Sequence, residues 1–172
     1  TFSTENWKRP DKEINFLFDL IRKSLKKSIK KIIKQGIKIN VIGKNKGLPK
    51  DIKSTIKFIK NRTLKNKTIT LNLALNYGSK EEILDVCKKI IKSKNKLVNE
   101  ESFEEKLYTK NIPDPDILIR TGGTKRLSNF LLWQLSYTEI FFVDKLWPDF
   151  NENDYNKIIN KFYNIKRNFG KI

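Results

Sequence analysis

A glycine turn flanked by two arginines is the stretch whose residue types most clearly suit chemistry. The apolar run 116–119 ends in Arg120, two glycines follow at 122–123, and Arg126 and Ser128 come close behind. Ligands of open parallel sheets bind at the carboxyl ends of strands, and glycines let backbone amides approach an anion closely. Arginine pairs with phosphate through its planar fork of donors. These residues therefore predict a phosphate or diphosphate pocket.

Each candidate residue also has a plainer structural interpretation. Arg120 at a strand end can be a surface salt-bridge residue, and Ser128 can be the N-cap of a following helix. The two roles of Ser128 are compatible, because a helix N-terminus itself attracts anions. Downstream, Glu139 opens an apolar strand and can be a solvated strand end, while Asp114 and Asp116 flank a proline and are typical of a turn.

The composition narrows the chemistry. With one cysteine and no histidine, the chain has no intrachain disulfide, no Cys/His zinc site and no Ser-His-Asp triad. Cys87 shares a helical stripe with Ile83, Ile90 and Ile91, which predicts that it is buried. No apolar run reaches the roughly 20 residues of a membrane span, and no signal-peptide pattern opens the chain. We therefore expect a reducing, cytoplasmic compartment.

Length and charge set the broad class. The chain has 172 residues, enough for one domain with its own core, and we expect a single domain over 1–172. The formal net charge of +18 suits nucleic acid, anionic membranes and diphosphates. Lysines occur along nearly every segment, arginine is scarce, and isoleucine and asparagine are abundant. This pattern favours a solvated lysine surface, and no nucleic-acid partner is expected.

Hydrophobic periodicity alternates between helix-like and strand-like segments. Apolar residues recur at helical spacing over 11–35, and Gly36 supplies the stop. Strands separated by helices predict an α/β fold with a mainly parallel open sheet flanked by helices. The other predicted helices span 51–61, 80–92, 103–108, 129–137 and 152–168, and the predicted strands span 37–42, 68–76, 116–120 and 139–143.

Three motifs, in the same order, resemble those of the cis-prenyltransferases, the family of undecaprenyl and dehydrodolichyl diphosphate synthases. They are residues 2–10 (FSTENWKRP), residues 71–78 (LNLALNYG) and residues 113–150, which contain RTGG, SNFLLWQ and LWPDF. No Asp-Asp-x-x-Asp occurs, so the aspartate-cluster chemistry of trans-prenyltransferases is not indicated.

The resemblance implies a fold and a missing part. The family fold is a parallel six-stranded sheet flanked by helices, with a hydrophobic tunnel for the growing chain. The family's opening Asp-Gly-Asn-Gly-Arg-Trp motif, which carries a metal-binding aspartate, would lie before Thr1. The first strand and first helix are therefore expected to be missing, and the 172 residues alone are expected to be inactive. Candidates for the tunnel wall, or equally for plain core, are Phe16, Leu17, Phe18, Leu20, Leu71, Leu73 and Leu75.

The resemblance also implies roles at the glycine turn. Arg120, Arg126 and Ser128 match the positions that hold the diphosphate of isopentenyl diphosphate. Glu139 matches the glutamate that joins the missing aspartate in binding Mg²⁺, the expected cofactor. Thr124 stands where glutamate is common in the family.

The loop motif carries the other implied site residues. Ser3, Asn6 and Trp7 match the catalytic loop beside the reacting carbons, with Asn76 and Tyr77 on the same rim. Arg9 matches the arginine that reaches the allylic diphosphate. The plainer interpretation of this loop is a helix-entry segment before Pro10.

The implied activity is transfer of isopentenyl units to an allylic diphosphate such as farnesyl diphosphate, which forms Z polyprenyl diphosphate for dolichol or other polyprenol synthesis. The alternatives are a non-catalytic subunit of a heteromeric enzyme and, more weakly, a basic nucleic-acid-binding domain. Aromatic residues at 133, 141–142 and 147 predict a homodimer through the C-terminal half, or they fill the core. Peripheral contact with the endoplasmic reticulum membrane stays open.

Overall fold

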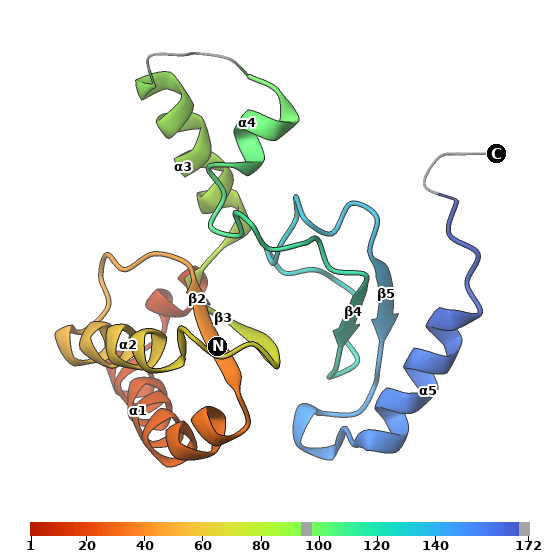
Figure 1. Cartoon of the computed structure of the whole chain (residues 1–172), viewed down its shortest axis with the longest axis horizontal. Helices are drawn as coiled ribbons and strands as arrows, with labels where there is room; N and C mark the ends of the chain where they lie inside the picture. Colours follow the sequence, from red (N-terminus) through yellow and green to blue (C-terminus); the bar gives the residue numbers. More distant parts are fainter. Residues whose placement is uncertain (94–97, 169–172) are drawn as a thin grey trace. The chain divides into compact units, whose positions relative to one another are not determined.

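The computed structural model describes residues 1–93 and 98–168. It divides into two compact units, Thr1–Lys110 and Asn111–Ile172. Figure 1 shows the helices and strands of the chain, coloured along the sequence.

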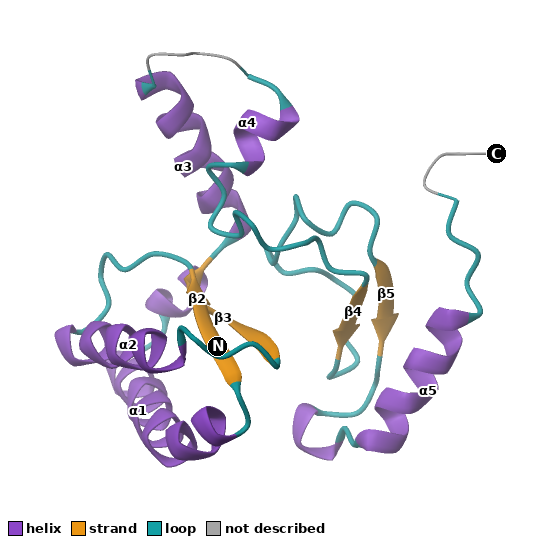
Figure 2. Ribbon diagram, viewed as in Figure 1, coloured by secondary structure: helices purple, strands orange, loops and turns teal. Residues whose placement is uncertain are grey.

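The first unit is built on a parallel sheet whose central strand is β3 (Ile69–Tyr77). Figure 2 draws β3 in orange as a strand. β2 (Ile37–Ile42) pairs along one edge of β3, and β1 (Phe2–Ser3) pairs along the other. The chain passes from β2 to β3 through α2 (Lys50–Thr63), the kind of crossover that a parallel pair requires. The predicted α/β fold with a parallel sheet flanked by helices is confirmed.

Two amphipathic helices share one core with this sheet. α1 (Asp11–Lys34) follows Pro10, and its chain turns at Gly36, where φ is +66°. α1 and α2 direct their apolar stripes toward the sheet, as helical spacing predicts. The shared core consists of Phe2, Ile14, Phe18, Leu48, Ile52, Ile56 and Leu75.

Helix α3 (Ser79–Lys92) follows β3 and buries a different stripe from the predicted one. Val86 and Ile90 are buried, whereas Cys87 is exposed and Ile91 is 70% exposed. The prediction of a buried Cys87 is wrong, because Val86 occupies the inner face of the helix in its place.

The short helix predicted at 103–108 begins earlier, as α4 (Glu100–Glu104). Asn99 Oδ1 accepts a hydrogen bond from the Ser102 amide at 2.8 Å, and Ser102 Oγ accepts one from the Asn99 amide at 3.1 Å. This reciprocal cap fixes the start of the helix at Glu100.

The second unit contains a parallel pair of strands, β4 (Ile117–Arg120) and β5 (Glu139–Phe142). The 3-10 helix η2 (Trp147–Asp149) and the helix α5 (Glu152–Tyr163) follow. Helix α5 ends five residues before the predicted boundary at 168. Both predicted strands are confirmed to within a residue.

The helix predicted at 129–137 is wrong, because the chain forms a series of turns there. Ser128, Asn129 and Leu131 have φ values of +48°, +59° and +47°. Residues in this left-handed region cannot continue a right-handed helix. The interpretation of Ser128 as a helix N-cap is therefore also wrong.

Within the described residues, no helix is both long and apolar enough to cross a membrane.

Gly43, just after β2, lies so close to the backbone of β3 that it leaves no room for a side chain. Its φ is +122°, and a Cβ atom there would lie 2.1 Å from the carbonyl oxygen of Leu75. We expect Gly43→Ala to lower the free energy of unfolding by about 3 kcal/mol, because the backbone clash adds to a left-handed strain of roughly 1–2 kcal/mol. Urea denaturation measures this loss.

Gly47→Ala is the matched control. Gly47 has φ +88°, but an added Cβ would meet nothing nearer than the Trp7 ring at 3.7 Å. Only the strain, about 1 kcal/mol, is expected for this variant. Equal losses in the two variants would contradict the importance of the approach at Gly43.

Candidate active site

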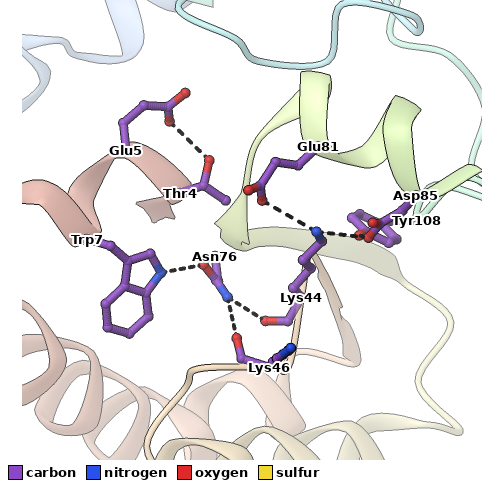
Figure 3. Close-up of polar contacts among 9 residues, drawn as sticks. All are labelled: Thr4, Glu5, Trp7, Lys44, Lys46, Asn76, Glu81, Asp85 and Tyr108. Carbon is purple, nitrogen blue, oxygen red and sulfur yellow. Dashed lines mark hydrogen bonds and ion pairs between the residues drawn. The ribbon is translucent and has the colours of Figure 1, made fainter. Parts of the chain in front are cut away.

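Asn76 joins three segments of the first unit at the carboxyl end of β3 (Figure 3). Its Oδ1 accepts a hydrogen bond from Trp7 Nε1 at 2.7 Å, and its Nδ2 donates to the carbonyl oxygens of Lys44 and Lys46, each at 2.9 Å. The residue has φ +52°, a region that asparagine tolerates better than most residues. Because Asn76 is only 4% exposed, water competes little for these bonds. The carboxamide therefore holds the Trp7 indole at the strand end.

Ser3 and Asn6 shape the loop in which they lie. The Ser3 amide donates to Asn6 Oδ1 at 2.7 Å, and Ser3 Oγ accepts from the Glu5 amide at 3.1 Å. These bonds cap the 3-10 helix η1 (Thr4–Lys8). The loop motif is thus a structured turn that its own side chains hold in shape.

Trp7 and Arg9 are exposed, whereas Ser3 and Asn6 are half-buried. The Trp7 ring lies 5.1 Å from the Phe2 ring and 5.7 Å from the Phe18 ring, measured between centroids. The indole remains 38% exposed although it is held by packing and by Asn76. The Arg9 guanidinium lies 3.6 Å from the Glu13 carboxylate, and both are well exposed.

Glu82, on the first turn of α3, is a fully buried carboxylate. It accepts hydrogen bonds from the Tyr77 hydroxyl at 2.6 Å and from the Tyr108 amide at 2.7 Å. A buried charge requires such partners. Glu82 therefore ties the end of β3 to the segment after α4, a role that its sequence position did not reveal.

A second polar group surrounds Lys44 (Figure 3). Lys44 Nζ lies 3.1 Å from Asp85 and 3.6 Å from Glu81, and the Tyr108 hydroxyl donates to Asp85. Burial and the hydrogen bond to Asp85 raise the pKa of Tyr108. Burial alone would raise the pKa of Asp85, but the hydrogen bonds from Tyr108 and Lys44 lower it instead. The phenol stays a donor and the carboxylate stays charged.

An apolar cavity of about 350 Å³ is lined by α1, α2 and two strands of the sheet. Its wall is aliphatic except for Thr1 and Ser24, as suits a hydrocarbon ligand. Of the residues predicted for a tunnel, Phe18 lies in the core, and Phe16 and Leu71 are exposed. Those that line the cavity are Leu17, Leu20, Leu73 and Leu75.

In the second unit, the structure brings Arg120 and Ser128 together. Arg120 Nη1 donates to Ser128 Oγ at 3.1 Å, across the turn that follows β4. Arg120 Nε is buried and has no hydrogen-bond partner among the described residues. A buried charged donor without a partner is costly, and a bound anion would satisfy it.

The glycine amides of this turn are already used. The Gly122 amide donates to the Lys145 carbonyl oxygen at 2.8 Å, and the Gly123 amide donates to the Val143 carbonyl oxygen at 3.0 Å. The expectation that these amides approach the anion is therefore wrong. The charged side chains remain as donors, and Arg126 lies exposed in the same turn.

Glu139 lies at the other end of the strand pair. It is the first residue of β5 and pairs with Ile117, whereas Arg120 pairs with Phe142. Three residues of strand separate the two positions, which is about 10 Å. The Glu139 carboxylate lies 3.8 Å from Arg167 Nε.

Arg167 also contacts two residues close to Glu139, namely Asp116 and Tyr137. Its Nη1 lies 2.5 Å from the Asp116 carboxylate, and its Nη2 donates to the Tyr137 carbonyl oxygen at 3.0 Å. Sequence reasoning missed this contact, because the arginine lies 51 residues after Asp116.

Glu139 is the one predicted metal ligand. In the described part of the chain, no group of three or more His, Cys, Asp or Glu side chains is placed to hold a metal. Mg²⁺ at diphosphate sites takes one or two carboxylates, and diphosphate oxygens and water fill the other positions. A single, partly exposed carboxylate fits that role.

The predicted site residues divide between the two units. Those of the first unit are Ser3, Asn6, Trp7 and Arg9, and those of the second are Arg120, Arg126, Ser128 and Glu139.

The chain is similar to known proteins over nearly its whole length. A family model described as "Putative undecaprenyl diphosphate synthase" matches residues 1–170. The isoprenyl transferase of Rickettsia typhi is 44% identical over 175 residues, which cover 99% of this chain and 76% of that protein. The isoprenyl transferase of Aquifex pyrophilus is 42% identical, with 99% and 74% covered.

Two solved structures share the fold. A probable undecaprenyl diphosphate synthase from Campylobacter jejuni has a TM-score of 0.90 and 38% identity, with 99% of this chain and 80% of that chain covered. Lavandulyl diphosphate synthase from Lavandula x intermedia, solved with dimethylallyl diphosphate, has a TM-score of 0.92 and 34% identity, with 99% and 76% covered. Sequence and fold together show that this chain belongs to the undecaprenyl diphosphate synthase family, the cis-prenyltransferases.

Proposed function

We propose that the full-length protein transfers isopentenyl units from isopentenyl diphosphate to an allylic diphosphate and forms a polyprenyl diphosphate with Z double bonds. The observation that carries this proposal is the Arg120–Ser128 pair, in which the buried Arg120 Nε has no partner within residues 1–93 and 98–168. Membership of a family of prenyltransferases supports chain elongation as the reaction.

The residues divide the work of the reaction. Arg120, Arg126 and Ser128 hold the diphosphate of isopentenyl diphosphate through charge-assisted hydrogen bonds. The alkene of this substrate attacks the allylic carbon, the allylic carbon–oxygen bond breaks, and loss of a proton leaves the new double bond. Arg9 stabilises the charge of the departing diphosphate.

The loop and the cavity position the allylic substrate. Asn76 holds Trp7 in place beside Ser3 and Asn6, which we assign to the reacting carbons. The aliphatic cavity accepts the hydrocarbon chain, with farnesyl diphosphate as the proposed primer. The names of the bacterial relatives favour an undecaprenyl-type product over a dolichol precursor. The presence of both the loop motif and the arginines argues against a non-catalytic subunit.

Mg²⁺ is the proposed cofactor, and Glu139 would supply one carboxylate oxygen to it. When bound, the ion supplies positive charge that stabilises the departing diphosphate.

Arg120→Lys tests the diphosphate site. Lysine keeps the charge but loses the planar fork, so it cannot donate to Ser128 and to a diphosphate in the same way. We expect a higher KM for isopentenyl diphosphate and a fall in turnover of about tenfold or more, equivalent to about 1.4 kcal/mol. Steady-state kinetics of the full-length protein measure both values.

Arg62→Lys, at an exposed position of α2, is the matched control and should leave both values unchanged. Wild-type kinetics for Arg120→Lys would reject the assignment of the pocket.

Removal of divalent cations tests the cofactor. We expect excess chelator to abolish incorporation of labelled isopentenyl diphosphate and added Mg²⁺ to restore it. Glu139→Gln should raise the Mg²⁺ concentration that gives half-maximal activity, because it removes a charged oxygen ligand. The exposed Glu152→Gln should not. Undiminished incorporation in chelator would overturn the metal requirement.

We also propose a homodimer that pairs through the second unit. Its exposed apolar residues include Trp147 at 73%, together with Leu146 and Phe142. Monomers rarely expose so much large apolar surface. Light scattering should give twice the single-chain mass, and Trp147→Lys should shift the protein toward the monomer. Leu84→Lys, on exposed α3, should not. A wild-type monomer would contradict the dimer.

A further inference from the structure

Lys44 is a charged residue of the first unit to which the proposed reaction assigns no role. It lies in the segment 43–49, which joins β2 to α2 and belongs to no helix or strand. Its Nζ lies 3.1 Å from the Asp85 carboxylate and 3.6 Å from the Glu81 carboxylate, both on α3 (Figure 3). The Lys44 side chain therefore ties this segment to a helix that follows the next strand of the chain.

The backbone of Lys44 is bonded to Asn76 in both directions. The Lys44 amide donates to the Asn76 carbonyl oxygen at 3.1 Å, and the Asn76 carboxamide donates to the Lys44 carbonyl oxygen at 2.9 Å. The same carboxamide accepts the hydrogen bond from Trp7 Nε1. A displacement of Lys44 therefore moves the group that holds the indole.

The segment 43–49 also supports the indole by direct contact. A Cβ atom added to Gly47 would lie 3.7 Å from the Trp7 ring, so the backbone at Gly47 runs beside that ring. Lys46 supplies the second carbonyl oxygen to which Asn76 donates. The position of the segment thus affects Trp7 both through the carboxamide and through packing.

Asp85 is itself held at the other end of the ion pair. It accepts a hydrogen bond from the Tyr108 hydroxyl, and the Tyr108 amide donates to the buried Glu82 at 2.7 Å. The Tyr108 ring packs edge-on against the Tyr77 ring, with 6.4 Å between centroids. A lysine ammonium on its flexible stem has no preferred geometry of its own, so a carboxylate with a second partner decides where it lies.

We propose that the Lys44–Asp85 ion pair positions Trp7 for the reaction through Asn76. The pair keeps the segment 43–49 against the end of β3, and the segment holds the carboxamide that fixes the indole. Lys44 and Asp85 are positioning residues, because they act through Asn76 and not on a substrate. The effect on turnover rests on the proposed function, whereas the effect on the indole does not.

Direct binding of a diphosphate is the competing role for Lys44. Two carboxylates at 3.1 and 3.6 Å already surround its ammonium group, and they would repel an incoming anion. The geometry therefore favours positioning. Partly exposed ion pairs contribute little to the stability of a fold, whereas small displacements of a catalytic loop reduce the rate strongly. Loss of the pair should therefore affect turnover more than the melting temperature.

Hydrogen exchange of the Trp7 indole tests the positioning without any substrate. Lys44→Met and Asp85→Asn each remove the ion pair and should speed exchange of the Trp7 Nε1 proton by about fivefold or more, because its bond to Asn76 opens more often. Nuclear magnetic resonance of the full-length protein measures this rate, with the signal assigned by Trp7→Phe. The indole protons of Trp133 and Trp147 are the internal references.

Steady-state kinetics test the effect on the reaction. Each single variant should lower kcat by about tenfold and change the KM for isopentenyl diphosphate by less than about twofold, since that diphosphate is assigned to Arg120 and its neighbours. The double variant should be no slower than the slower single variant, because the two residues act as one pair. Lys44→Arg keeps the charge and should retain most of the activity.

Arg22→Met is the matched control. Arg22 is 31% exposed, as Lys44 is 30% exposed, and it joins α1 to α2 through Asp51. Its loss should leave both indole exchange and kcat unchanged. Circular dichroism and thermal melting check that each variant folds.

The outcomes separate the two proposals. Unchanged indole exchange in Lys44→Met, faster exchange with an unchanged kcat, an equal loss in Arg22→Met, or a raised KM as the main effect would overturn the positioning role. Faster exchange in both single variants of a protein that forms no product would support the positioning and contradict the proposed function instead.

Discussion

The hydrogen bonds of the Asn76 carboxamide are the constraint on which the first unit depends. One side chain with little exposure accepts from Trp7 and donates to two carbonyl oxygens of the segment between β2 and α2. The Lys44 amide in turn donates to the Asn76 carbonyl oxygen at 3.1 Å. The loop motif, the β2 end and the β3 end are therefore fixed to each other by a single residue. Such an anchor holds the Trp7 side chain in one position, because loops are otherwise more mobile than the elements they connect.

The sequence predicted most of the scaffold, for identifiable physical reasons. The strand at 37–42 is found at its predicted bounds, because its β-branched run is bounded by glycines at both sides. The long α1 follows from a sustained helical stripe. The segment 129–137 fails because its apolar residues imitate a helical pattern while Ser128, Asn129 and Leu131 adopt left-handed backbone. Such dihedral angles are set by packing and are not readable from residue type outside glycine and asparagine.

The candidate site was predictable to a similar extent. Arg120 and Ser128 were expected in one diphosphate pocket from the glycine turn and the resemblance, and the structure places them within hydrogen-bond distance of each other. The use of the glycine amides by Lys145 and Val143 was not predictable, since it depends on where the chain runs after β5. The same holds for Arg167 beside Glu139 and for the buried Glu82, because both contacts join segments that are distant in sequence or hidden by an ordinary helical pattern.

In the first unit, the helices and strands that line an apolar cavity also carry much of the positive charge of the chain. Aliphatic side chains of α1, α2, β2 and β3 surround this cavity. In the second unit, Arg120 Nε has no hydrogen-bond partner among the residues that the structure describes. The proposed reaction gives these features to two different substrates: the cavity to the hydrocarbon of the allylic primer, and the cationic donor to the diphosphate of isopentenyl diphosphate.

The central claim is Z-specific chain elongation, and product analysis tests it most directly. The full-length protein would be supplied with an allylic diphosphate, labelled isopentenyl diphosphate and Mg²⁺, and the dephosphorylated products would be resolved by chain length and by double-bond geometry. The account predicts a series of products that differ by one isoprene unit and whose new double bonds are Z. Absence of extension, or new double bonds that are E, would contradict it.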